Sequence, residues 1–377
     1  MRRREKCVIK ETLKPDALAI PEDIDDITLE WLQSSLKSRD IDDELRSFSV
    51  APIGEGFGQT GIAALIRLDY ANTAKSSANR PETLVIKMAT PDPTRRAVAR
   101  SMNLYDREVR FYQTLAEDVR VRVPRCFFAQ ISEDGLAYAL LLEGFADHRP
   151  GDETIGCSIE DARIAVPELA RLHAPNWDSA LAKSMSSFPA IDQAKYEQAW
   201  DRMIADFGHL VPEEIQSAKA RYIERIPSLV RWIGSDPITV IHADYKLDNL
   251  LFGPPGSPDP IVVLDWQGMR PGKPIQDFAY LIGQNMNSEL RRAQEVGLLK
   301  LYLEALEKEG ITYDFSTAYS DYRKATLYLW SYVIAITGLM VNNHERAIRR
   351  KSGLIQRAAS AVMDLDTLSL LDQFSAT

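Results

Sequence analysis

The sequence predicts an α+β fold in which a small antiparallel sheet precedes a larger, mainly helical part. Two observations predict it: segments that alternate apolar and polar residues are concentrated between residues 48 and 142, and helical patterns dominate after residue 145. The 377 residues suggest two or three domains, or one large two-lobed domain. We expect an N-terminal helical extension over residues 1–45, a sheet-bearing lobe over 46–143 and a helical lobe over 144–377.

The composition excludes several classes of protein. The chain has 45 Lys and Arg against 54 Asp and Glu, a formal charge of −9, whereas a protein that binds nucleic acid usually has a basic excess. Its three cysteines contain no Cys-x-x-Cys pair, so a disulfide framework or a thiolate zinc site is disfavoured. This cysteine usage indicates a protein of the reducing cytoplasm. The basic N-terminus is not followed by the apolar region of a signal peptide.

The predicted elements begin with a short amphipathic helix from Thr28 to Leu36, within an acidic segment that we interpret as a solvated face. A helix is expected around Asn103–Leu115. Five segments have the alternation and the flanking turn residues of strands: Phe48–Ile53, Ile62–Tyr70, Thr83–Met88, Arg125–Gln130 and Ala137–Leu142.

Two short apolar strands, Thr239–Ile241 and Ile261–Leu264, interrupt the helical part. The segment Ala325–His344 has 20 residues without a formal charge if His344 is neutral, near the length of a membrane-spanning helix. Five polar residues lie within it, so we interpret it as a buried core helix and predict no membrane span.

The strongest chemical signal is His242-Ala-Asp244-Tyr-Lys-Leu-Asp-Asn249, which follows the first of these strands, with Asp265 at the end of the second. Metal-assisted phosphoryl transfer needs a carboxylate near the acceptor hydroxyl and oxygen ligands for Mg²⁺, held on rigid strand ends. In this interpretation Asp244 takes or orients the hydroxyl proton, while Asn249 and Asp265 bind Mg²⁺. The alternative is a turn rich in Asp and Asn that binds nothing.

A glycine-rich segment, Gly56-x-Gly58-x-x-Gly61, leads into the strand that starts at residue 62. A dinucleotide-binding turn would instead open a helix. Glycines without Cβ atoms let backbone N–H groups approach phosphate oxygens, so this hairpin is a candidate cover for a triphosphate. The alternative is an ordinary turn.

Lys87 is a single charge within an otherwise apolar strand, and unpaired burial of a charge is costly. We expect it to bind phosphate oxygens and to pair with Glu108 on the following helix, in preference to Glu117 or Asp106. The alternative is a lysine that points to solvent.

These motifs, in this order, resemble the protein-kinase-like phosphotransferases, especially the branch that contains aminoglycoside phosphotransferases, choline kinases and ecdysteroid-kinase-like enzymes. The resemblance covers roughly residues 54–277. It implies a two-lobed protein-kinase-like fold with a small antiparallel β N-lobe and a larger, mainly helical C-lobe. It also implies ATP (or GTP) and Mg²⁺ as cofactors, and transfer of the γ-phosphoryl group to a hydroxyl of a small-molecule acceptor.

The resemblance implies a role for each matching residue, in this order: a phosphate-covering loop at Gly56, Gly58 and Gly61, a phosphate clamp of Lys87 and Glu108, a hinge at Glu143 and Phe145, a catalytic base at Asp244, metal ligands at Asn249 and Asp265, and loop supports at His242 and Asp277. His173 is similar to a recurring helix-end position, and we expect it to serve packing or capping.

Departures from the protein kinases bear on the substrate. Ala243 replaces the arginine before the catalytic aspartate, and only 11 residues separate Asp265 from Asp277. That connection is too short for the segment on which a peptide substrate lies, so a protein kinase is the less favoured alternative. A non-catalytic nucleotide-binding protein is the other.

The acceptor is less defined. Charges are balanced after residue 285, whereas a polycationic aminoglycoside would favour an acidic pocket. Aromatic residues are dense between Tyr313 and Tyr332; we interpret most of them as core, and any that face the cleft would suit an apolar or ring-shaped alcohol. The sequence contains no signal for the oligomeric state.

Overall fold

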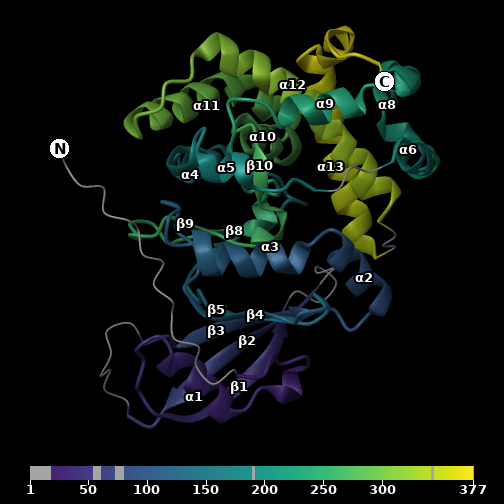
Figure 1. Cartoon of the computed structure of the whole chain (residues 1–377). Coiled ribbons are helices and arrows are strands. Elements are labelled where there is room, and N and C mark those ends of the chain that lie inside the picture. Colours follow the sequence, from purple (N-terminus) through teal and green to yellow (C-terminus); the bar gives the residue numbers. More distant parts are fainter. Residues whose placement is uncertain (1–17, 54–60, 73–79, 189–191, 341–343, 377) are drawn as a thin grey trace, which may run out of the picture. The chain divides into compact units, whose positions relative to one another are not determined.

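The computed structural model describes residues 18–53, 61–72, 80–188, 192–340 and 344–376 (Figure 1). The chain divides into two compact units. Unit 1 comprises the residues up to Arg96 together with Arg125–Gly144, and unit 2 comprises Ala97–Pro124 together with Phe145 onward. The helix α2 (Pro93–Ser101) spans the first boundary.

Unit 1 is a five-stranded antiparallel sheet in the order β1-β2-β3-β5-β4, which confirms the predicted sheet. Each predicted strand is present to within a few residues. The elements of unit 1 are η1 (Ile24–Asp26), α1 (Leu29–Lys37), β1 (Leu45–Ile53), β2 (Gly61–Tyr70), β3 (Thr83–Ala89), β4 (Cys126–Ile131) and β5 (Tyr138–Glu143).

The predicted N-terminal helix packs on this sheet as α1. The Thr28 hydroxyl accepts a hydrogen bond from the Trp31 backbone N–H at 3.1 Å, which caps the helix. Trp31 contacts Phe128 of β4 edge to face, with ring centroids 5.0 Å apart. The buried side chains of α1 and one face of the sheet therefore form one core, which also includes Ile66 and Ile86.

Unit 2 is mainly helical and contains two small sheets. The elements before its strands are α3 (Leu104–Arg110), the π-helical turn η2 (Phe111–Leu115), α4 (Ile159–His173), η3 (Ala174–Asn176), α5 (Ala180–Ser184), α6 (Gln193–Phe207), η4 (Gly208–Leu210), α7 (Glu213–Ser217), α8 (Lys219–Ile223) and α9 (Ile226–Ile233). Its strands are β6 (Arg149–Pro150), β7 (Thr239–Ile241), β8 (Leu250–Phe252), β9 (Ile261–Val263) and β10 (Arg270–Gly272).

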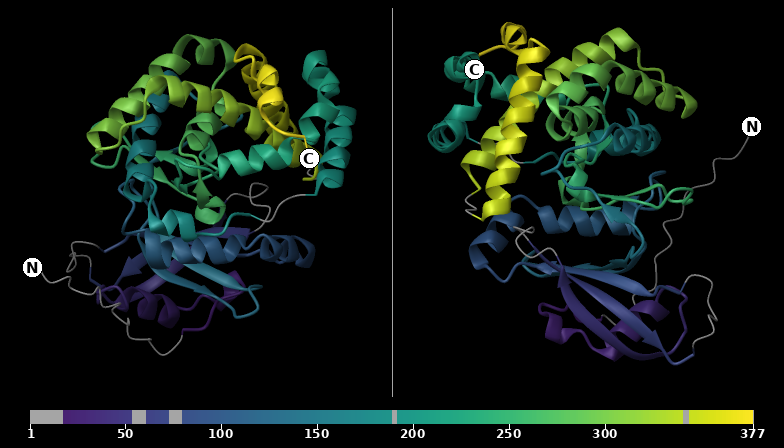
Figure 2. Two further views of the ribbon diagram at one scale, coloured as in Figure 1. Left: turned by 45° about the horizontal axis from the view of Figure 1, so that its top comes forward. Right: turned by 180° about the vertical axis from the view of Figure 1, so that it is seen from behind.

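The remaining elements of unit 2 are η5 (Leu247–Asn249), η6 (Trp266–Gly268), α10 (Ile275–Tyr280), the π-helical turn η7 (Leu281–Asn285), α11 (Ser288–Lys308), α12 (Phe315–Gly338), α13 (Glu345–Asp364) and η8 (Thr367–Gln373). One sheet pairs β10 with β7, and the other has the order β6-β8-β9. The long helix α13, yellow in Figure 2, contacts α12 and η7.

The helix expected over residues 325–344 has different bounds. It starts ten residues earlier, at Phe315, and ends at Gly338. Leu339 and Met340 are exposed, so the apolar run continues past the helix without being buried. Most of the helix is buried, which agrees with the core interpretation, and among the described residues no helix is long and apolar enough to cross a membrane.

A close contact between α12 and α6 leads to the first testable prediction. A Cβ atom at Gly338 would lie 2.0 Å from the carbonyl oxygen of Ala199, so Gly338→Ala must push two helices apart. We expect this variant to lower the free energy of unfolding by roughly 1–3 kcal/mol, as measured by urea denaturation. Gly297 of α11 is the matched control because a Cβ atom there would meet nothing within 4 Å, and Gly297→Ala should be neutral or stabilising. Equal stability of the two variants would contradict the prediction.

Candidate active site

The loop between β7 and β8 carries the predicted catalytic residue Asp244. A buried carboxylate, Asp277 of α10, holds this loop: it accepts the backbone N–H of His242 at 2.7 Å and that of Ala243 at 2.8 Å. Ala243 has a left-handed backbone with φ 65°, a conformation that costs a residue other than glycine free energy. The two hydrogen bonds to Asp277 therefore stabilise a strained turn directly before Asp244.

Asp277 is itself oriented by His173, at the end of α4. His173 Nε2 lies 3.2 Å from Asp277 Oδ2, and His173 Nδ1 lies 2.8 Å from the hydroxyl of Tyr302. Burial alone would raise the pKa of Asp277, but the hydrogen bond and charge of His173, together with His242, lower it below its ordinary value. His173 thus acts through Asp277, in addition to the packing that we expected of it.

This network predicts a pH-dependent loss of stability in Asp277→Asn. The amide would present an N–H group to a backbone donor, so we expect the free energy of unfolding to fall by roughly 3 kcal/mol at pH 7. Because the folded pKa is lowered, the stability that ionised Asp277 contributes is fully present above its unfolded pKa, about 3.9, and is lost as the pH falls through the folded value. Denaturation of both proteins from pH 7 to 3 should give a difference that shrinks only below about pH 4. A difference independent of pH would contradict this account.

His242 braces the loop with a defined tautomer. Its Nδ1 accepts the backbone N–H of Asp244 at 3.2 Å, so its Nε2 carries the hydrogen and donates to the carbonyl oxygen of Leu264 at 2.8 Å. His242 therefore connects the loop of Asp244 to the residue before Asp265.

The carboxylate of Asp244 is held by three donors. Its Oδ2 accepts from Lys246 Nζ at 2.8 Å and from Asn249 Nδ2 at 2.9 Å, and its Oδ1 accepts from the hydroxyl of Tyr280 at 3.1 Å. The side chain of Asp244 is 22% exposed, so it is oriented by the protein and accessible to a ligand. Burial and the adjacent charge of Asp244 raise the pKa of Tyr280 well above its ordinary value. Tyr280 therefore stays protonated, and its hydroxyl serves as a hydrogen-bond donor to Asp244.

The sequence motif contains Lys246, yet we predicted no role for it. Burial would lower the pKa of Lys246, but the charges of Asp244, Asp265 and Asp248 raise it above its ordinary value. A permanent positive charge therefore lies beside Asp244. The position of Lys246, two residues after Asp244, is the sequence signal that could have identified it. Tyr280 lies 36 residues away from Asp244, and no sequence signal connects the two residues.

The predicted metal ligands flank the paired strands β8 and β9, with Asn249 directly before β8 and Asp265 two residues after β9. Leu264 N–H donates to the carbonyl oxygen of Asn249 at 2.9 Å, and Asp265 follows with a left-handed backbone of φ 64°. Asn249 uses its amide nitrogen on Asp244, and among the described residues its side-chain oxygen accepts no hydrogen bond. That oxygen and the Asp265 carboxylate are the hard donors that Mg²⁺ prefers.

Within the described parts of the chain, no three His, Cys, Asp or Glu side chains form a metal-binding group. If Asn249 and Asp265 hold Mg²⁺ as predicted, they would supply one amide and one carboxylate oxygen, and phosphates and water would supply the other ligands. Trp266 helps to place Asp265: its ring stacks on Phe111 with centroids 3.8 Å apart and lies 4.7 Å from the ring of His242.

The remaining predicted residues are divided between the units. In unit 1, Lys87 is half-buried in β3, opposite Ala63 and Leu140. Glu108 is buried in α3, which groups with unit 2, so the expected pair of Lys87 and Glu108 stays a prediction. Gly61 begins β2, where a Cβ atom would lie 2.9 Å from the carbonyl oxygen of Met88.

Gly56 and Gly58 lie outside the described residues. At the predicted hinge, Glu143 ends β5 and accepts the backbone N–H of Arg125 at 3.1 Å. Phe145 is the first residue of the longer segment of unit 2, so the division between the units falls at this hinge.

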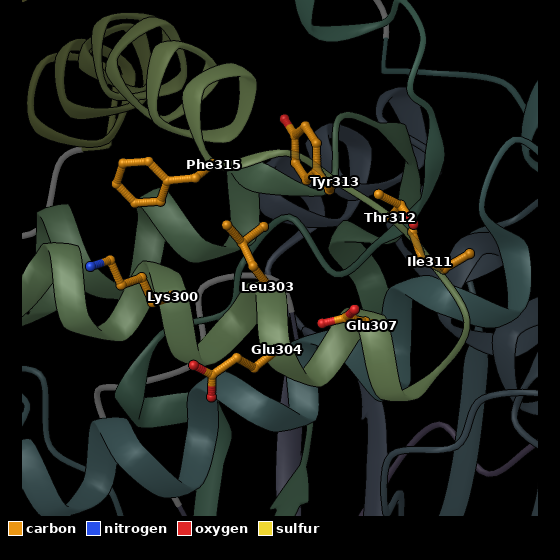
Figure 3. Close-up of a pocket in the computed structure, with 8 residues that line it drawn as sticks. All are labelled: Lys300, Leu303, Glu304, Glu307, Ile311, Thr312, Tyr313 and Phe315. Atoms are coloured by element: carbon orange, nitrogen blue, oxygen red, sulfur yellow. The ribbon is translucent and has the colours of Figure 1, made fainter.

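A surface cavity of about 310 Å³ lies between α11 and the start of α12 (Figure 3). None of the predicted site residues lines it. Its walls are Lys300, Leu303, Glu304, Glu307, Ile311, Thr312, Tyr313 and Phe315.

Comparison with known proteins gives two curated relatives. An uncharacterized oxidoreductase of Caenorhabditis elegans, dhs-27, is 20% identical over 315 residues, which are 76% of this chain and 38% of that protein. Acyl-CoA dehydrogenase family member 10 of Mus musculus is 27% identical over 159 residues, which are 35% of this chain and 15% of that protein. The chain thus spans well under half the length of the curated relatives it matches.

Solved structures share the fold over about nine tenths of the chain. A protein of Ralstonia eutropha assigned as an aminoglycoside phosphotransferase has a TM-score of 0.53 and 16% identity, over 92% of this chain and 99% of that one. A microcompartment-associated aminopropanol kinase has a TM-score of 0.50 and 16% identity, over 93% and 100%. The GDP complex of wild-type aminoglycoside 2'-phosphotransferase-IIIa has a TM-score of 0.50 and 15% identity, over 88% and 99%. The predicted kinase-like fold is therefore confirmed.

The model of the ecdysteroid kinase-like family matches residues 58–312, about two thirds of the chain, and includes every predicted site residue except Gly56. This match agrees with the resemblance that the sequence motifs predicted. The chain belongs to the ecdysteroid kinase-like family.

Proposed function

We propose that the chain is a small-molecule kinase that transfers the γ-phosphoryl group of ATP (or GTP) to a hydroxyl group of its acceptor, with Mg²⁺. Family membership and the kinase-like fold support the class of reaction. The observation that carries the proposal is the Asp244 carboxylate, oriented by Lys246, Asn249 and Tyr280 and still accessible.

In the proposed reaction the acceptor oxygen forms a bond to the γ-phosphorus and the bond from that phosphorus to the β-phosphate oxygen breaks. ADP leaves with the electron pair, and the hydroxyl proton passes to Asp244. Bound Mg²⁺ would neutralise charge on the phosphates, and Asn249 and Asp265 would hold it. Lys246 would supply a further positive charge beside the transferred group.

Two observations favour a small molecule over a protein as the acceptor. The solved neighbours include an aminopropanol kinase and the GDP complex of an aminoglycoside phosphotransferase. The 11 residues between Asp265 and Asp277 are used by η6, β10 and the start of α10, which leaves no free segment to support a peptide.

The experiment that tests this function is an ADP-release screen with MgATP and MgGTP against alcohols of several classes, joined to a thermal-shift titration. A nucleotide at 100 times its Kd stabilises a protein by about 2.7 kcal/mol, which raises the melting temperature measurably. Stabilisation together with ADP release from an alcohol supports the proposal. Stabilisation without turnover of any alcohol would favour a non-catalytic nucleotide-binding protein, and phosphate transfer to peptides would favour a protein kinase.

A further inference from the structure

A buried arginine lies beside the catalytic loop. Arg270 begins β10, and its Cα lies opposite that of Ile241, the residue that ends β7 directly before His242. Arg270 is 4% exposed. Its guanidinium donates to the hydroxyl of Tyr332 and, at 3.5 Å, to the carbonyl oxygen of Gly268. In the described part of the chain no carboxylate forms an ion pair with it.

A second buried arginine lies against the same aromatic ring. Arg107 of α3 is 6% exposed, and its guanidinium lies 4.5 Å from the ring centroid of Phe188, while that of Arg270 lies 5.3 Å from it. Arg107 Nε is buried and has no hydrogen-bond partner among the described residues. The other nitrogens of Arg107 donate only to peptide carbonyl oxygens, those of Ser186, Ser187 and Met269.

Two like charges are thus buried together, and among the described residues neither guanidinium has a carboxylate within ion-pair distance, although the charge of Asp277 acts on Arg270 from farther away. Burial and the charge of Arg270 lower the pKa of Arg107. Burial would also lower the pKa of Arg270, but Tyr332, Tyr328 and the charge of Asp277 raise it above its ordinary value, so Arg270 stays charged. Buried charges in proteins are normally paired, and a guanidinium matches a carboxylate or phosphate through two parallel hydrogen bonds. An anion from outside the chain would supply the missing charge.

The position of this pair indicates which molecule carries the anion. The ring of Tyr332, the hydrogen-bond partner of Arg270, contacts the ring of Tyr280 with centroids 6.1 Å apart. The hydroxyl of Tyr280 in turn donates to Asp244. The arginines therefore lie close to the carboxylate that meets the acceptor hydroxyl, and in the segment that follows Asp265.

We propose that Arg270 and Arg107 bind an anionic group of the acceptor, so that the substrate is an alcohol that also carries a carboxylate or a phosphate. This rests on the proposed function, because it assigns the hydroxyl of the same molecule to Asp244. The aromatic rings of Phe188 and Tyr332 suit an apolar carbon chain between the two polar ends.

The first test uses binding alone and needs no nucleotide. The full chain is titrated with ω-hydroxycarboxylates of three to eight carbons, with glycerol 3-phosphate, and with the methyl esters of the same hydroxy acids, and the melting temperature is recorded. We expect at least one anion to stabilise the protein and its neutral ester to do so at least tenfold more weakly. No stabilisation by any of these anions, or equal stabilisation by acid and ester, would overturn the proposal.

The variants locate the anion. Arg270→Gln should weaken binding of the stabilising anion at least tenfold, and Arg270→Lys should restore part of it, since the charge is kept and the bidentate geometry is lost. The matched control is Arg323→Gln, because Arg323 of α12 also donates to peptide carbonyls, those of Leu365 and Asp366. If Arg270→Gln does not fold, Arg270→Lys, which keeps the charge and loses the bidentate geometry, replaces it and should bind the anion more weakly than the wild type. Wild-type affinity for the anion in the folded variants would overturn the proposal.

ADP release separates this proposal from the proposed function. Release with hydroxy acids or glycerol 3-phosphate, and an acceptor KM that rises at least tenfold in Arg270→Lys while the nucleotide KM is unchanged, supports both. Equal rates with neutral or amino alcohols would support the kinase and overturn the anion site. Anion-dependent stabilisation that requires Arg270, without turnover of any alcohol, would keep the binding site and overturn the kinase. A nucleotide KM that rises with an unchanged acceptor KM would assign Arg270 to the nucleotide instead, and would overturn the proposal.

Discussion

Replacing Asp244 by Asn is expected to lower kcat by roughly 10²–10⁴, the usual cost of losing a positioned general base. The amide is nearly isosteric, so the loop should keep its shape through Asp277, which bonds the backbone of His242 and Ala243 and does not touch the side chain of Asp244. What is lost is the carboxylate that we propose as the acceptor of the hydroxyl proton. The measurement is steady-state ADP release with an accepted alcohol, with the KM for the nucleotide determined in parallel.

The nucleotide KM should change little in Asp244→Asn, because Asn249 and Asp265, the proposed metal ligands, are unaltered. Asp201→Asn is a matched control: Asp201 of α6 is exposed and, like Asp244, bonds a lysine, Lys219. It should have wild-type kcat. Near-normal turnover in Asp244→Asn would refute the assignment of Asp244 as the base.

Features encoded by neighbouring residues were predictable from the sequence. The strands β7 and β9 are short apolar runs, and each ends just before a polar motif. The apolar run therefore predicts the strand, and the motif that follows it predicts where the strand ends. The five strands of unit 1 have clear alternation or turn residues at their ends, and their predicted antiparallel sheet is confirmed. Local patterns sufficed here because sheet strands and motif loops are each a few residues long.

Features that depend on distant residues were not predictable. The orientation of Asp244 depends on Tyr280, which is 36 residues away in the sequence. The orientation of Asp277 depends on His173, 104 residues away, and His173 in turn contacts Tyr302, 129 residues away from it. The strands β6, β8 and β10 have two or three residues each, too few to show a period. The pair of Lys87 and Glu108 stays a prediction, since the two residues belong to different units.

The aromatic residues between Tyr313 and Tyr332 illustrate the same limit. We interpret most of them as core, and Tyr322 at 0% and Trp330 at 1% exposure agree with this, whereas Phe315 is 39% exposed. Tyr332 lies in the same helix, α12, yet its hydroxyl accepts from Arg270. Only the tertiary structure distinguishes the aromatic residue near the active site from those that fill the core.

Removal of the Asp265 carboxylate is expected to abolish the dependence of nucleotide affinity on Mg²⁺. In the wild type, ATP with Mg²⁺ should bind at least about tenfold more tightly than ATP with EDTA, because the metal would join the proposed ligands Asp265 and Asn249 to the phosphates. In Asp265→Ala the two affinities should be equal. Fluorescence or calorimetric titration of both forms measures this difference without any need to know the acceptor.

The backbone at Asp265 requires a second variant. Its φ of 64° is a left-handed conformation that alanine adopts at a cost, whereas asparagine tolerates it well. Asp265→Ala therefore changes both the charge and the local backbone, while Asp265→Asn changes the charge and keeps the conformation. If the loss of metal dependence comes from the missing carboxylate, both variants lose it, and Asp372→Ala, at an exposed aspartate of η8, retains it. Wild-type MgATP affinity in Asp265→Asn would show that the carboxylate does not bind the metal.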